Sequence, residues 1–65
     1  MGHADRLALL QLGFRGVVQY RRKRGADGWH NMAAFDQFSV AENYAKDCAS
    51  GEPPWQYQAV NLETA

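Results

Sequence analysis

Apolar and polar residues alternate one by one in three stretches of the chain, and a helical spacing separates the second stretch from the third. The alternating stretches are residues 14–23, 29–35 and 55–62. Such alternation is typical of a β-strand that buries one face. The pattern therefore predicts three strands, the first of which is apolar only in its first half.

The alternation also predicts which side chains share a face of the sheet. In the first strand, Val18 and Tyr20 share one face, and Gln19 and Arg21 share the other. In the third strand, the two sets are Trp55, Tyr57 and Ala59 against Gln56, Gln58 and Val60. In the second strand, the two sets are Trp29, Asn31, Ala33 and Phe35 against His30, Met32 and Ala34.

The sequence GADG at residues 25–28 separates the first two strands. Glycine supplies the positive φ that tight turns need, and aspartate is a common turn residue. This stretch therefore predicts a β-hairpin.

Residues 39–51 have the pattern of a capped helix. Ser39 and Glu42 form a capping-box sequence, Gly51 suits a C-cap, and Pro53 and Pro54 prevent continuation. The helical spacing places one apolar stripe at Ala41, Tyr44, Ala45 and Cys48. Because the stripe is made mostly of small residues, we expect the helix to approach the sheet closely, with Tyr44 as its main anchor.

Residues 4–12 are mostly helix formers, and Gly13 is a natural stop. We expect a short helix or an arm in residues 1–13, followed by a single ββαβ domain in residues 14–65. The fold class is α+β: a three-stranded antiparallel or mixed sheet with one helix packed on one face. The other face and at least one edge are expected to be open, which favours a partner.

The chain has 65 residues, so it is one domain near the lower limit for folding alone. Cys48 is the only cysteine, which excludes an internal disulfide and suits a reducing compartment. No apolar run reaches the length of a membrane-spanning helix, and no signal peptide is visible. We expect a cytoplasmic protein, in the host cytoplasm if a phage encodes it.

The formal net charge is zero, but the charges are divided along the chain. Residues 1–24 contain six basic residues and one acidic residue, and residues 25–65 contain one basic and six acidic. The acidic half would repel a polyanion unless the fold turns it away. A dipolar surface suits a protein partner at least as well.

The basic run YRRKR at residues 20–24 is the first candidate for a binding site. A regular strand would point Arg22 and Arg24 to one face and Arg21 and Lys23 to the other, so the run would not form one patch. A solvated hairpin tip that resists aggregation is the simpler interpretation. The functional alternative is contact with phosphates or with an acidic protein surface.

The aromatic residues on the strands are the second candidate. Arginines beside aromatic rings are able to hold single-stranded nucleic acid, and tryptophans on an uncovered face are frequent anchors of protein interfaces. A small chain without isoleucine also needs these rings for its core. The predicted partner-binding residues are Tyr20, Arg21, Arg22, Arg24, Trp29, Trp55 and Tyr57.

The sequence gives no support for catalysis, a cofactor or a metal. His30 has no nucleophile placed by a motif, and Cys48 on the helical stripe is expected to be buried and inert. His3, His30 and Cys48 lack the spacing of metal ligands. We therefore expect a protein that is not an enzyme.

The order of hairpin, helix (SVAENYAKDCAS) and closing strand (WQYQAVNLE) resembles that of small proteins encoded by phages and other mobile elements, among them the anti-CRISPR inhibitors. The resemblance covers the topology of residues 14–63 and carries over no functional residue. It implies stoichiometric binding to a CRISPR–Cas effector, often across its nucleic-acid-binding surface. The five basic residues from Arg15 to Arg24 depart from the acidic inhibitors that mimic DNA.

These observations give three hypotheses. The first is a protein-interaction module, such as a phage or mobile-element inhibitor that blocks a host complex. The alternative is a nucleic-acid-binding accessory protein in which residues 21–24 contact phosphates and the aromatic rings stack on bases. The third is a structural module that forms a homodimer through an exposed strand edge.

Overall fold

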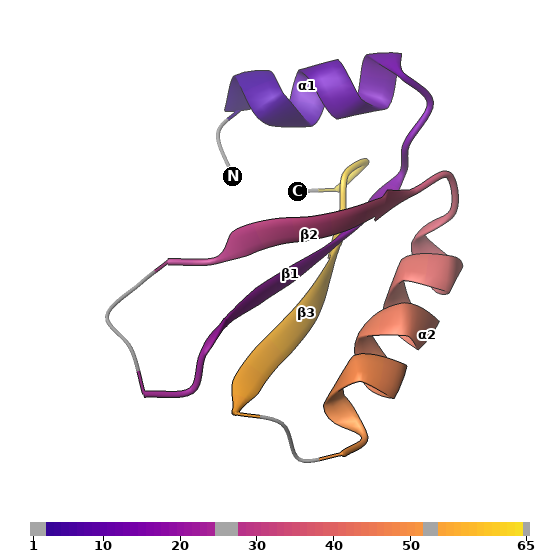
Figure 1. Cartoon of the computed structure of the whole chain (residues 1–65). Helices are drawn as coiled ribbons and strands as arrows, with labels where there is room; N and C mark the ends of the chain where they lie inside the picture. The colour runs from indigo at the N-terminus through magenta and orange to yellow at the C-terminus, as the bar shows by residue number, and fades with distance from the viewer. Residues whose placement is uncertain (1–2, 25–27, 52–53, 65) are drawn as a thin grey trace.

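Three antiparallel strands form one open sheet in the order β2–β1–β3 (Figure 1). The helix between the second and third strands packs along one face of this sheet. The computed structural model describes residues 3–24, 28–51 and 54–64. The elements are α1 (His3–Gln11), β1 (Gly16–Arg22), β2 (His30–Phe35), α2 (Phe38–Ala49) and β3 (Trp55–Asn61). The predicted α+β class is confirmed, with an all-antiparallel sheet.

The central strand is β1, and it pairs with both neighbours along most of its length. The β1–β3 pairing runs from Gly16 opposite Asn61 to Arg22 opposite Trp55. The β1–β2 pairing stops earlier, at Tyr20 opposite His30. The predicted turn at residues 25–28 lies outside the described residues except for Gly28.

Small residues bring α2 close to the sheet, as the sequence predicts. Ala41 and Ala45 of α2 are buried against Val18. Gly16 lies directly under the start of the helix, where an added Cβ would be 2.9 Å from the Ala41 Cβ and from the Phe38 Cα. A side chain at position 16 would therefore push the helix away from the sheet.

Two predictions about the α2 stripe are wrong. Tyr44, the expected anchor, is 38% exposed, and its ring touches only the rim of the core at Phe35, with centroids 5.3 Å apart. Cys48 is half-buried rather than buried. Ala41 and Ala45 lie nearer to the sheet than either, so the close approach of the helix leaves the larger side chains at its margins.

The predicted capping box is also wrong. The N-cap is Gln37, which has an extended backbone and no side-chain cap hydrogen bond. Because the helix already begins at Phe38, Ser39 lies inside its first turn and cannot act as the cap. At the other end the cap is Ser50 rather than Gly51, and the Ser50 backbone N–H and Oγ both donate to the Asp47 carbonyl.

A glycine ends α1 where the sequence places the stop. Gly13 has a φ of 96°, a left-handed conformation that favours glycine. Its N–H donates to the Leu10 carbonyl (3.0 Å), and the Phe14 N–H donates to the Leu9 carbonyl (3.0 Å). This is the Schellman pattern of a helix end, and it turns the chain into β1.

The second strand carries a β-bulge that changes its faces. Ala33 pairs with Val18 and Asn31 pairs with Gln19, so Met32 is an extra residue. The bulge moves Asn31 to the face opposite Ala33, whereas the regular alternation of the sequence predicted one shared face. His30 consequently lies beside Tyr20, on the face that α2 covers.

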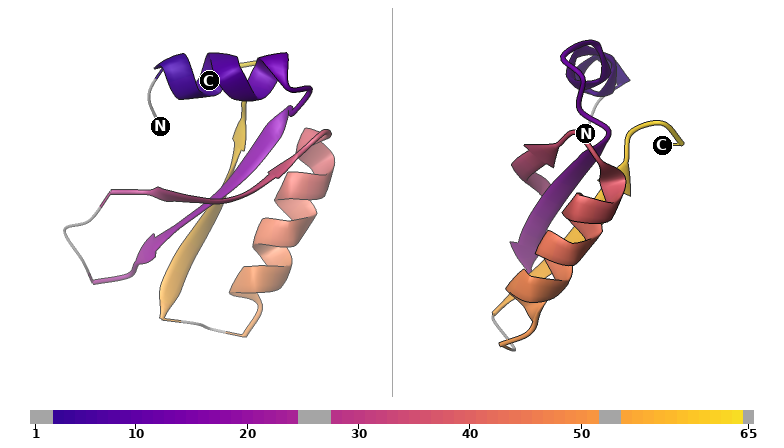
Figure 2. Two further views of the ribbon diagram at one scale, coloured as in Figure 1. Left: turned by 45° about the horizontal axis from the view of Figure 1, so that its top comes forward. Right: turned by 90° about the vertical axis from the view of Figure 1, so that its right-hand side faces the viewer.

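The face of the sheet away from α2, called here the far face, is only partly open. α1 lies over the end of this face where β1 begins and β3 ends (Figures 1 and 2). Val17 and Leu62 at that end are 1% and 0% exposed. The expectation of a bare far face is therefore wrong for this end, because α1 and the C-terminal segment cover it.

No helix within residues 3–24, 28–51 and 54–64 is long and apolar enough to cross a membrane.

Candidate functional site

The seven predicted partner-binding residues all lie at one end of the sheet, opposite to α1. We call this the hairpin end and define it as residues 20–24, 28–30 and 54–57. It contains the end of β1, the start of β2 and the start of β3 (Figure 1). The pairing of Arg22 with Trp55 and of Tyr20 with Tyr57 brings these distant parts of the sequence together.

On the α2 side of the hairpin end, the aromatic rings pack on one another. The Tyr20 and Trp55 rings meet edge to face with centroids 5.4 Å apart, and the His30 ring lies 5.5 Å from Tyr20. The Arg22 guanidinium carbon is 5.6 Å from the Trp55 ring centroid. Tyr20 and Trp55 are half-buried by these contacts, whereas His30 stays exposed.

On the far face, Arg21 is held by two neighbours. Its guanidinium carbon lies 4.4 Å from the centroid of the Trp29 ring, and its Nε donates to Gln56 Oε1 at 2.8 Å. The stack and the hydrogen bond fix the plane of the guanidinium. The two Nη groups form no hydrogen bond within the described part of the chain.

A row of side-chain amides crosses the far face beside Arg21. Gln58 Nε2 donates to Gln19 Oε1 at 2.7 Å, and Gln19 Nε2 donates to Asn31 Oδ1 at 2.9 Å. We call Gln58, Gln19 and Asn31 the amide row. Gln19 at its centre is only 3% exposed, and its partners satisfy its hydrogen bonds.

Arg22 and Arg24, which the alternation places on one face, line one hollow together with Lys23. The strand ends at Arg22, so Lys23 and Arg24 leave the alternating pattern. A hollow of about 520 Å³ is lined by Arg22, Lys23, Arg24, Pro54 and Trp55. The Lys23 N–H donates to the Pro54 carbonyl at 3.2 Å and joins the two sides of this hollow.

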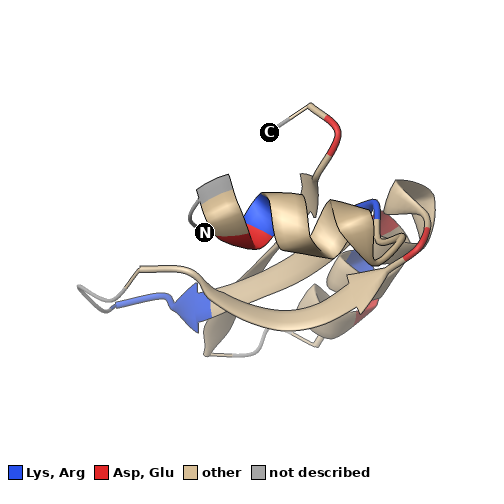
Figure 3. Cartoon of the chain, turned by 90° about the horizontal axis from the view of Figure 1, so that it is seen from above, with Lys and Arg blue, Asp and Glu red and all other residues tan. Residues whose placement is uncertain are grey.

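The described acidic residues lie elsewhere (Figure 3). Glu42 and Asp47 belong to α2, on the face away from Arg21, and Asp36 follows β2 at its other end. Asp5 and Glu63 belong to α1 and to the C-terminal segment. The hairpin end thus gathers positive charge without a described carboxylate; Asp27 and Glu52 lie outside the described residues.

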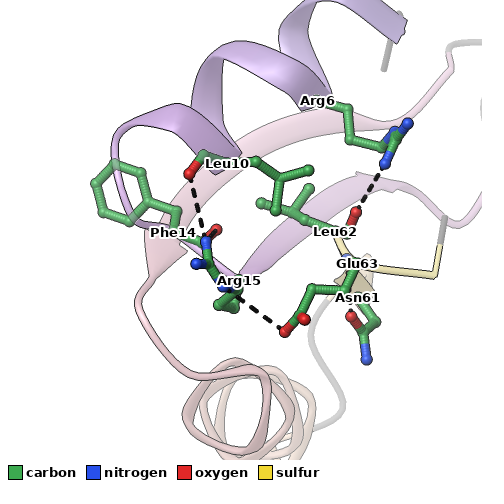
Figure 4. A network of polar contacts seen from close by, with 7 residues as sticks. All are labelled: Arg6, Leu10, Phe14, Arg15, Asn61, Leu62 and Glu63. Atoms are coloured by element: carbon green, nitrogen blue, oxygen red, sulfur yellow. Dashed lines mark hydrogen bonds and ion pairs between the residues drawn. The ribbon is translucent and has the colours of Figure 1, made fainter.

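The two remaining arginines have structural partners at the α1 end (Figure 4). Arg6 Nη1 donates to the Leu62 carbonyl at 3.0 Å. Arg15 Nη1 donates to the carbonyls of Leu10 and Phe14, and its Nε is 3.7 Å from Glu63 Oε1. These contacts join α1 to the C-terminal segment, which separates Arg6 and Arg15 from the cations of the hairpin end.

Sequence reasoning missed the polar part of this site. The far-face positions of Gln19, Gln56 and Gln58 follow from the alternation, and three glutamines on one face were a usable signal. Asn31 could not be added, because its place in the amide row depends on the bulge.

No group of three or more His, Cys, Asp or Glu side chains within the described residues is arranged to hold a metal ion. Comparisons with protein-family models, with curated proteins and with solved structures find no match to this chain.

Proposed function

We propose that this chain is a non-enzymatic nucleic-acid-binding protein and that it binds through the hairpin end. One observation carries the proposal. The cations of residues 21–24 gather at one end of the fold, and the described carboxylates lie on other elements. Local positive charge binds the phosphate backbone even when the net charge of the protein is zero.

Two of the arguments for a protein partner carry less weight against the observed fold. The first was an uncovered sheet face, but its apolar end is buried at Val17 and Leu62 and its open part is a polar amide row. The second was the acidic half of the sequence, whose described members belong to other elements than the cations of residues 21–24 (Figure 3).

The proposed roles differ from those expected for single-stranded binding. Lys23 and Arg24, which are exposed, contact phosphates, and Arg21 is fixed against Trp29. Tyr20 and Trp55 support the end of the sheet through ring packing, and Tyr57 packs against the core, rather than stacking on bases. Affinity therefore depends on charge more than on these aromatic rings.

The test is a titration of fluorescently labelled DNA and RNA, both single- and double-stranded, at 50 mM and 200 mM salt. We expect micromolar binding at the lower salt and a loss of at least tenfold at the higher salt. The double variant Lys23→Glu/Arg24→Glu should abolish binding. Lys46→Glu on α2 is the matched control and should leave most of the affinity in place. Absence of binding to every probe at 50 mM salt refutes the proposal.

A protein partner is the second candidate, and one observation favours it. All seven predicted residues at this site are tryptophan, tyrosine or arginine, the residue types that dominate the energetics of protein interfaces. The hypothesis of a phage inhibitor of a CRISPR–Cas effector stays a prediction from topology. Capture of the same host protein by wild type and by Lys46→Glu, but not by Trp55→Ala, would support it.

A further inference from the structure

The far face of the hairpin end offers hydrogen-bonding groups that the fold does not use. Gln58 keeps Oε1, Gln56 keeps Nε2, and Arg21 keeps both Nη groups, within the described residues. Arginine and amide side chains are the groups that read base edges in the major groove of DNA. Arg21 and Gln56 are held by the hydrogen bond between them, and Gln58 is held by its own hydrogen bond to Gln19.

The shape of this end suits the major groove. Beyond Tyr20 and His30 the pairing continues only between β1 and β3, as the two cross-strand pairs Arg21–Gln56 and Arg22–Trp55. We call these two pairs the β1–β3 ribbon. Paired strands lie about 4.8 Å apart. The major groove of B-DNA is about 12 Å wide and admits a two-stranded ribbon. α1 is at the opposite end of the far face and leaves this ribbon free (Figure 2).

Arg21 is the best-placed reader of a base. Its Nε is occupied by Gln56 and its plane is set by Trp29, so the two Nη groups remain as a fixed fork. A guanidinium fork that donates to O6 and N7 of guanine is the commonest specific contact in the major groove. A hollow of about 440 Å³ adjoins Arg21, and its lining is Arg21, Lys23, Trp29, Ala49, Trp55, Gln56, Tyr57 and Gln58.

We infer that the hairpin end binds double-stranded DNA, with the β1–β3 ribbon in the major groove and Arg21 in contact with a guanine. This inference rests on the proposed function and adds the form of the nucleic acid and the base that is read. Lys23 and Arg24, at the end of β1, contact phosphates beside the groove. The unused amide groups of Gln56 and Gln58, which are half-buried, contact the neighbouring base edges.

The first experiment selects binders from a pool of duplexes with a random central region and compares their affinity with that of the same sequences as single strands and as RNA. We expect enrichment of a short motif that contains guanine and duplex binding at least tenfold tighter than single-strand binding. Equal or tighter binding to single strands or RNA overturns the inference but not the proposed function. If the protein binds none of these nucleic acids, both the inference and the proposed function are overturned.

The second experiment tests the contact itself with the unchanged protein. The guanines of the selected motif are replaced one at a time by 7-deazaguanine, which keeps base pairing and lacks the N7 acceptor. One replacement should weaken binding roughly 5- to 150-fold, the range of one bidentate contact. Arg21→Lys, which keeps the charge, should lose the preference for that guanine and keep binding to random duplex. If no replacement changes the affinity for the duplex, the proposed contact between Arg21 and a guanine is overturned.

Discussion

The guanidinium carbon of Arg21 lies over the ring of Trp29, 4.4 Å from the ring centroid. Arg21 belongs to β1, and Trp29, eight positions later in the sequence, directly precedes β2. Their stack joins the basic run to the start of β2. It makes Arg21 the one cation of the hairpin end with both an aromatic and a hydrogen-bonded partner among the described residues.

Trp29→Leu removes this stack and keeps an apolar side chain. A cation–π contact at a partly exposed site contributes about 0.5–1 kcal/mol. We therefore expect DNA affinity to fall about two- to fivefold, because the guanidinium is no longer held in place, while the free energy of unfolding changes by about 1 kcal/mol or less. Fluorescence anisotropy and urea unfolding measure the two effects. Unchanged affinity would show that Trp29 does not position Arg21 for binding.

The salt dependence of binding counts the phosphate contacts. Each phosphate neutralised on B-DNA contributes a slope of about −0.9 to log K against log salt. Arg24→Ala should reduce the magnitude of the slope by about 0.9, since Arg24 is exposed and proposed to contact one phosphate. Lys46→Ala removes the same charge from α2 and should leave the slope unchanged. Equal slopes for the wild type and Arg24→Ala would remove Arg24 from the interface.

Gly16→Ala tests the close approach of α2 to the sheet. The new Cβ would be 2.9 Å from both the Ala41 Cβ and the Phe38 backbone, so the helix must shift. Overpacking of this kind costs about 1–3 kcal/mol of unfolding free energy. Gly51→Ala is the control, because nothing lies within 4 Å of its added Cβ. Chemical denaturation compares the two variants, and equal stability would contradict the packing described for position 16.

Leu62→Ala tests whether the α1 end is a packed part of the fold. Leu62 is completely buried, and truncation of a buried leucine costs about 2–5 kcal/mol. Leu12→Ala is the control, since Leu12 is 74% exposed, and its effect should stay within about 0.5 kcal/mol. Thermal unfolding followed by circular dichroism measures both. A Leu62→Ala variant as stable as Leu12→Ala would mean that the C-terminal segment does not pack against the fold.

The order of elements and the faces of two strands could be predicted from the sequence because they depend on local alternation. Val18 and Tyr20 of β1, and Tyr57 of β3, lie on the expected face. The faces of β2 could not be predicted, because the bulge at Met32 is set by pairing with Val18 and Gln19 on another strand. One extra residue moves each side chain of β2 that precedes it to the opposite face of the sheet.

The site was predicted in part for the same reason. Its seven residues were found from residue type, and the pairing of β1 with β3 brings them to one end. Arg21 and Arg22 lie on opposite faces, as the alternation predicts, whereas Lys23, which follows the end of the strand at Arg22, lines a hollow with each of them. The amide row was missed, since its hydrogen bonds join three strands and one of them, β2, is out of regular register.

Binding through the hairpin end is tested most directly by recording amide and indole N–H resonances of the ¹⁵N-labelled protein while a short DNA duplex is added at 50 mM salt. We expect the chemical-shift changes to concentrate at residues 20–24 and 55–58 and at the indole of Trp29. The resonances of α1 and of the exposed side of α2 should stay unchanged. A spectrum that does not change at all, or that changes mainly along α2, would contradict binding through the hairpin end.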